Sequence, residues 1–121
     1  MKYLCLAYAD QEKWDAQSRD EQDAVRDQCR LHNEELERDG HPIENNCLKW
    51  GATTVRVRNG KLTVTDGPFA ETKERVGGFF FLEARDLNEA IQVVSRLPGA
   101  RMGEHLGWGI EIREVEEIPH I

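Results

Sequence analysis

The sequence predicts an α+β fold in which one layer of helices covers an antiparallel sheet. The observations behind this prediction are a central hairpin signal, two capped amphipathic helices and short apolar runs near both ends of the chain. The expected order is strand, helix, hairpin, strand, helix and strand, which is typical of this architecture. With 121 residues, 39% of them hydrophobic and 32% charged, the chain suits one globular domain over residues 1–121.

The first elements are a strand and a long helix. Residues 3–8 form a short apolar run without charge, which indicates a buried strand, and the polar residues 10–17 are expected to form a loop. Ser18 with Glu21 forms a capping box that begins the helix, and Gly40 ends it in the left-handed conformation. The expected buried stripe of this helix comprises Val25, Cys29, His32 and Leu36.

The strongest local signal is a hairpin. Asn59 and Gly60 suit the positive φ angles of a two-residue type I′ turn between two β-rich runs. If the two residues that flank this turn face each other, Thr53 faces Asp66 at the open end of the hairpin. A slip of one residue would destroy the match of apolar residues on one face. Those apolar residues are Val55, Val57, Leu62 and Val64.

The remaining chain supplies an edge segment, a strand, a helix and a last strand. Residues 43–51 show no clear period, and we expect an ordered loop or edge segment there. Residues 79–82 read Phe-Phe-Phe-Leu, and because consecutive strand residues point to opposite faces, they predict a strand buried on both sides. One side suits the helices and the other a partner sheet, so we expect a twofold homodimer. A second cap at Asp86 and Glu89 begins the next helix, and Pro98 is expected to end it. Residues 100–106 are expected to form a loop, and residues 108–115 alternate as the last strand.

Composition excludes several classes of function. The net charge of −7 argues against direct binding to nucleic acid or to an anionic membrane, because both require a basic surface. No apolar run approaches the length of a membrane span, and Met1 leads directly into a strand rather than a signal peptide. The three cysteines lack the spacing of a disulfide framework, so we expect reduced thiols in a cytoplasmic protein.

The sequence also gives no basis for a metal or a cofactor. Cys29 and His32 share one helix face, but no further ligand lies at a suitable spacing. The glycines at 77–78 lack the spacing of a phosphate-binding loop and precede a strand rather than a helix.

Several short motifs together carry a family resemblance. Residues 66–69 read Asp-Gly-Pro-Phe, residues 52–56 read Ala-Thr-Thr-Val-Arg, and residues 71–74 read Glu-Thr-Lys-Glu shortly before Gly-Gly-Phe. This combination resembles the DGPF branch of the YCII-related proteins, over nearly the whole chain. The resemblance implies a ferredoxin-like subunit of the dimeric α/β-barrel type, with an antiparallel sheet covered on one face by two helices. Genes of this branch often lie beside, or are fused to, those of extracytoplasmic-function sigma factors, which implies a protein partner.

Asp66 is the strongest candidate for chemistry. Pro68 lacks the N–H that an Asx-turn would use, so the carboxylate either caps a short helical turn through the Phe69 N–H or points into solvent or a pocket. We assign Asp66 and His32 as the catalytic residues, since ionisable groups beside a pocket can exchange protons near neutral pH. The expected substrate-binding residues are Arg56, Phe69, Glu71 and Lys73.

These residues also have purely structural explanations. His32 can be a half-buried histidine with one hydrogen-bond partner, and Asp66 can be a cap on a solvated turn. The YciI-like branch of the family has a helix histidine paired with an aspartate, but that histidine falls near Cys29 here, so its dehydrochlorinase-type activity does not transfer. Two hypotheses remain: a cofactor-free acid–base enzyme or small-molecule-binding protein, and a non-catalytic regulatory partner of a sigma factor.

Overall fold

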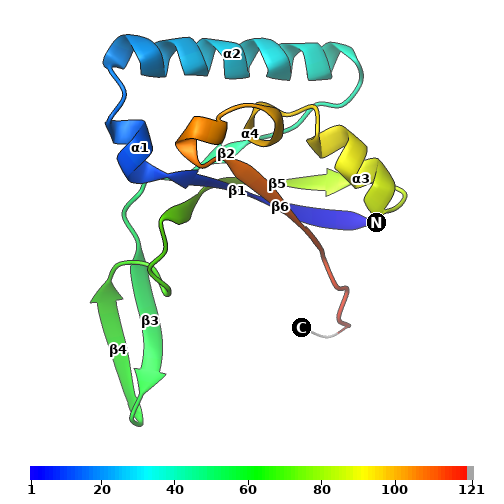
Figure 1. Ribbon diagram of the computed structural model, residues 1–121. Helices are drawn as coiled ribbons and strands as arrows, with labels where there is room; N and C mark the ends of the chain where they lie inside the picture. Colours follow the sequence, from blue (N-terminus) through cyan, green and yellow to red (C-terminus); the bar gives the residue numbers. More distant parts are fainter. Residues whose placement is uncertain (120–121) are drawn as a thin grey trace.

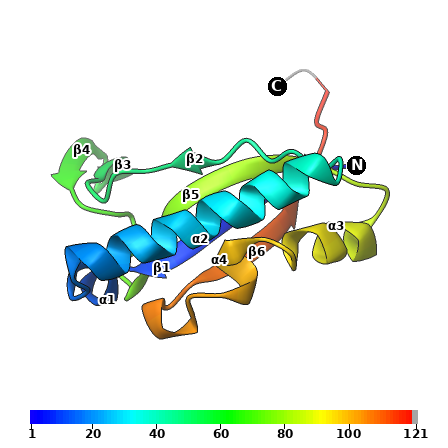
Figure 2. The same ribbon diagram turned by 90° about the horizontal axis from the view of Figure 1, so that it is seen from above.

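The computed structural model describes residues 1–119 and consists of a sheet with helices on one of its faces (Figure 1). The sheet has four antiparallel strands in the order β2-β5-β1-β6. These strands are β1 (Lys2–Asp10), β2 (Asn46–Cys47), β5 (Glu74–Glu83) and β6 (Gly109–Glu114). The long helix α2 (Arg19–Arg38) runs diagonally over the sheet with α3 (Leu87–Val94) beside it (Figure 2). This arrangement is the ferredoxin-like α+β fold. No helix within residues 1–119 is long and apolar enough to cross a membrane.

The core lies between the helices and the middle of the sheet. In β1, Tyr3 and Cys5 point toward the helices, and their partners on β5 are Leu82 and Phe80. Leu36 of α2 covers these residues from above. The remaining buried members of this cluster are Ala84, Ala90, Val94 and Leu97. The alternation of β1 and β5 therefore places one set of side chains in the core and the other on the open face.

Helix α2 begins and ends as predicted. The Ser18 hydroxyl accepts a hydrogen bond from the Glu21 N–H at 3.1 Å, and the Glu21 carboxylate accepts one from the Ser18 N–H at 3.0 Å. Hydrogen bonding of the Glu21 carboxylate to the Ser18 backbone and side chain lowers the pKa of Glu21. Gly40, with φ of 83°, ends the helix in the left-handed region. The predicted stripe is confirmed, with Val25, Cys29 and His32 half-buried and Leu36 buried.

The loops expected at residues 10–17 and 100–106 contain short helices instead. Asp10 accepts a hydrogen bond from the Lys13 N–H at 3.3 Å and caps α1 (Gln11–Asp15). The second predicted helix ends at Val94 as α3, and the chain continues into α4 (Pro98–Arg101) and the 3-10 helix η1 (Glu104–Leu106). Proline is favoured at the first position of a helix, so Pro98 begins α4 where we expected it only to end α3.

The hairpin has the predicted register but not the predicted surroundings. It comprises β3 (Thr53–Arg58) and β4 (Lys61–Asp66), with Thr53 opposite Asp66 and positive φ at Asn59 and Gly60. It forms a separate two-stranded ribbon that projects from one end of the body, away from the helices (Figure 1). The expected place of this hairpin in the main sheet was wrong, because β2 occupies the edge of β5. Of the two alternatives for Asp66, the cap of a helical turn is wrong, since residues 67–73 contain no helix, and the residue is exposed as in the other alternative.

The second face of the sheet is open within one chain, and its expected burial against a partner sheet stays a prediction. Phe80 is 2% exposed under the helices, whereas Phe81 is 52% exposed on the opposite face. Within one chain, β5 is therefore not buried on both sides. The apolar face of the hairpin is exposed as well, at Val55, Val57, Leu62 and Val64.

Phe80→Ala is expected to lower the free energy of unfolding by about 3–5 kcal/mol, because the ring is fully buried. Phe69→Ala removes the same ring from a site that is 72% exposed and should cost about 1 kcal/mol or less. Urea titrations of both variants provide the measurement. Similar losses in the two variants would contradict the assignment of Phe80 to the core.

Candidate ligand pocket

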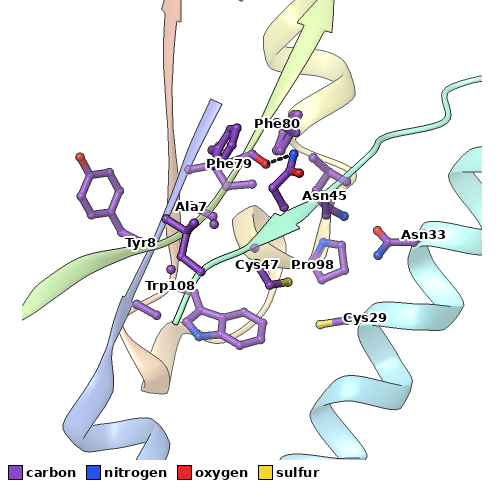
Figure 3. A pocket seen from close by; sticks show the side chains of 18 of the residues that line it. Ala7, Tyr8, Cys29, Asn33, Asn45, Cys47, Phe79, Phe80, Pro98 and Trp108 are labelled. Atoms are coloured by element: carbon purple, nitrogen blue, oxygen red, sulfur yellow. Dashed lines mark hydrogen bonds between the residues drawn. The ribbon is translucent and has the colours of Figure 1, made fainter. Parts of the chain in front are cut away.

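A pocket of about 440 Å³ lies between α2 and the sheet. Ala7 of β1 and Gly78 of β5 are paired in its floor, where the β1–β5 register shifts after Ala7. Cys29 and Asn33 of α2 form one wall, and Pro98 of α4 closes the far side (Figure 3). The pocket exists because small residues replace, at this end of the sheet, the large side chains that fill the core at the other end.

All three tryptophans of the chain line this pocket. Trp14 of α1 and Trp108, before β6, have ring centroids 6.3 Å apart and planes tilted by 31°. Trp108 lies directly against Gly103, where an added Cβ would stand 2.4 Å from the ring. Any side chain at residue 103 would clash with the Trp108 ring, so Gly103 is required for the ring to lie in the pocket wall. Trp50 packs on Gly77, with its ring 3.6 Å from the position of an added Cβ.

Few polar groups reach the pocket. Of the described residues that line it, only Arg26 is charged at neutral pH. Its guanidinium lies 5.2 Å from the centre of the Trp14 ring and 3.3 Å from an Asp23 carboxylate oxygen. The Asn33 Oδ1 atom is buried, and among residues 1–119 no group donates a hydrogen bond to it. Asn46 is already engaged, since its Nδ2 donates to the Phe79 carbonyl at 3.3 Å.

Two thiols stand at the pocket. Cys29 of α2 is half-buried and Cys47 of β2 is exposed, and both line the cavity (Figure 3). Burial raises the pKa of the Cys29 thiol, and the neighbouring Cys47 raises it further. The third thiol, Cys5, lies in the core, where burial raises its pKa to about 11.

The structure does not bring the predicted catalytic residues together. His32 lies on α2 with its Nδ1 2.8 Å from the Gln28 carbonyl one turn earlier, and Asp66 is exposed at the end of β4. Neither residue lines the pocket. Helix α2 and the hairpin project from opposite sides of the sheet (Figure 1). The dyad expected from the sequence is therefore not a single site within one chain.

The expected substrate-binding residues divide into two groups. Arg56 and Phe69 meet at the base of the hairpin, with the guanidinium 4.8 Å from the ring centre. Glu71 and Lys73 are exposed on the segment that leads to β5. None of these residues lines the pocket. Sequence reasoning missed Arg26 and Asn33, although their spacing of seven residues places them with Cys29 along one side of α2.

The YCII-related domain matches residues 1–118. The chain belongs to the YCII-related family. It is also similar to an uncharacterised protein of Rhizobium meliloti (strain 1021), with 33% identity over 102 residues that cover 83% of this chain and 82% of the relative. The range matched to the YCII-related domain contains every residue of the pocket, from Ala7 to Ile110.

The thiols of this YCII-related chain are expected to react with iodoacetamide in the order Cys47, Cys29, Cys5. Exposure favours Cys47, while burial both shields the other two and raises their pKa values, which lowers the fraction of reactive thiolate. Mass spectrometry of the alkylated peptides at neutral pH measures the order, and the urea-unfolded chain, with similar rates at all sites, is the control. Labelling of Cys5 before Cys47 would contradict the arrangement.

Proposed function

We propose that this YCII-related protein binds a small, partly apolar molecule in the pocket between α2 and the sheet. The observation that carries the proposal is a cavity of about 440 Å³ with mainly apolar and aromatic walls and few polar groups. Small-molecule sites in proteins have this size and composition.

The lining favours binding over acid–base catalysis in this pocket. Catalysis by proton transfer near neutral pH needs a group whose pKa lies close to the working pH. Among the described lining residues there is no carboxylate and no imidazole, and the pKa of the Cys29 thiol is raised by burial. Among the polar groups of the lining, Arg26 and Asn33 are suited to hold a ligand in one orientation.

Because all three tryptophans line the pocket, their fluorescence reports directly on its occupancy. Titration with the uncharged dye N-phenyl-1-naphthylamine is expected to quench tryptophan emission saturably. Ala7→Leu fills the floor of the pocket and should weaken binding at least tenfold. Ala24→Leu makes the same change on the exposed side of α2 and should leave binding unchanged. Unsaturable quenching, or equal affinity in both variants, would refute the proposal.

An acid–base role for Asp66 is a second proposal, supported by the fixed turn at the base of the hairpin. The Thr54 hydroxyl donates to the Gly67 carbonyl at 2.8 Å, and the Gly67 N–H donates to the Ala52 carbonyl at 2.8 Å. The Arg56 side chain on Phe69 places a cation at the same end of the hairpin. Such a turn can hold a carboxylate in place for chemistry.

Asp66→Asn separates the two roles of this carboxylate. If Asp66 is only an exposed residue of this turn, Asn replaces it with little effect, because the two side chains have nearly the same shape. If it supplies charge or accepts a proton, the variant keeps the wild-type melting temperature but loses its response to ligands that stabilise the wild type. His32→Gln is the companion variant, and unchanged melting and ligand response in both would leave these residues with structural roles.

We also propose a twofold homodimer in which the open faces of two sheets meet. This face carries Phe81 beside Leu4 of β1, and the exposed apolar face of the hairpin stands at its end. Exposed apolar side chains gathered on one face of a protein are typical of an interface. A second copy fits best, because an isologous contact covers the same surface on both chains at once.

Phe81→Lys is expected to convert the dimer to a monomer in light scattering at micromolar concentration, because it places charge in the centre of the contact. Ile91→Lys changes a half-exposed residue of α3 on the helix-covered side and should leave the dimer intact. A wild-type chain that is monomeric under these conditions would refute the homodimer. The exposed apolar face of the hairpin would then be free to bind a different protein. This is the surface that the second hypothesis, a regulatory partner of a sigma factor, requires.

A further inference from the structure

The polar groups of the pocket indicate the chemistry of its ligand. We propose that the pocket selects a planar aromatic carboxylate that carries a hydrogen-bond donor at its opposite end, with the carboxylate at Arg26 and the donor at the Asn33 Oδ1. The inference rests on the proposed function, since it names the ligand class of the same site.

The positive charge of Arg26 favours a ligand that carries a carboxylate. Its guanidinium lies against Trp14 and pairs with Asp23, and both members of this ion pair are more than half exposed. Exposed ion pairs contribute little to stability, so a ligand carboxylate can take the place of Asp23. Arginine suits this exchange because its planar fork binds a carboxylate through two parallel hydrogen bonds while its flat face stays on an aromatic ring.

The charges around the pocket favour one orientation of the ligand. A second, more open recess continues from the pocket along α2. It shares Arg26 and Asn33 with the pocket, and three glutamates line it. These are Glu34, Glu37 and Glu44. Glu34, which pairs with Arg30 at 3.0 Å, lies eight residues after Arg26, or about 12 Å along the helix. That separation exceeds the screening length of about 8 Å at physiological ionic strength, so these carboxylates repel an anion from their own end without cancelling its attraction to Arg26.

Asn33 supplies the second contact. It follows Arg26 by seven residues, so it lies on the same side of α2 about 10 Å further along the axis. Its amide points from the helix across the pocket toward Pro98 (Figure 3). Buried acceptors in proteins are nearly always satisfied, yet within residues 1–119 no group donates to the Asn33 Oδ1. A hydroxyl or N–H at the far end of the ligand donates the hydrogen bond that the Asn33 Oδ1 lacks.

The shape of the walls gives the preference for a planar ring. The tilted rings of Trp14 and Trp108 present an aromatic surface on one side, and the floor around Ala7 and Gly78 is flat because these residues project little or no side chain. Aromatic rings pack well in tilted and offset arrangements, which are more favourable than a face-to-face sandwich. A flat ligand therefore contacts both surfaces.

The experiment is a tryptophan-fluorescence titration of the full chain at pH 7 with 4-hydroxybenzoate, 4-hydroxybenzamide and benzoate. We expect 4-hydroxybenzoate to bind about tenfold more tightly than the amide, as a charge-assisted hydrogen bond provides. Arg26→Gln should abolish this preference, whereas Arg19→Gln, an exposed arginine of the same helix outside the pocket, should retain it. Asn33→Leu should abolish the preference for 4-hydroxybenzoate over benzoate without changing the preference for acid over amide.

Each outcome separates this inference from the function on which it rests. Equal binding of acid and amide, or a preference for the acid that survives Arg26→Gln, would overturn the ligand class and leave the pocket as a binding site. Binding of N-phenyl-1-naphthylamine without binding of any benzoate derivative would also overturn the ligand class and leave the pocket as a binding site. If neither the dye nor the benzoate derivatives bind, the proposed function falls together with the inference.

Discussion

The pairing of β1 with β5 is the constraint on which the rest of the structure depends. Its register sets Cys5 against Phe80 under the helices, and a slip of one residue would turn both side chains to the open face. The register then shifts after Ala7, opposite Gly78, where neither strand offers a large side chain. The same two strands therefore build a filled core at one end of the sheet and a pocket of about 440 Å³ at the other.

Gly78 determines how the edge strand β2 and the hairpin after it are placed relative to the pocket. A Cβ at this position would stand 2.9 Å from the Asn46 carbonyl oxygen, so only glycine lets β2 approach β5 this closely. The approach brings Cys47 to the edge of the pocket and occupies the edge of the sheet. The hairpin that follows finds no strand to pair with and leaves the body as a separate ribbon. The exposed apolar face of the hairpin thus follows from the close approach of β2 to β5.

The sequence predicted the features that depend on neighbouring residues. The Ser18–Glu21 cap and the register around Asn59 were visible because their residues are close in the chain. The pocket was not, because Trp14 and Trp108 meet only after α1 and η1 come together, and both segments were expected to be loops. The pairing of His32 with Asp66 relied on one shared pocket, which sequence spacing does not establish. Asp66 was placed correctly at the end of β4, and of the two alternatives for it the exposed position, rather than the helix cap, agrees with the structure.

The central claim is that the ligand site lies between α2 and the sheet rather than at the Asp66 turn. Nuclear magnetic resonance of the chain during titration with 4-hydroxybenzoate tests it most directly, since the indole N–H signals of the three tryptophans report on the pocket and the Gly67 amide reports on the turn. We expect the indole signals to shift together with one dissociation constant, while the Gly67 signal stays in place. A shift at Gly67 with unmoved indole signals would contradict it.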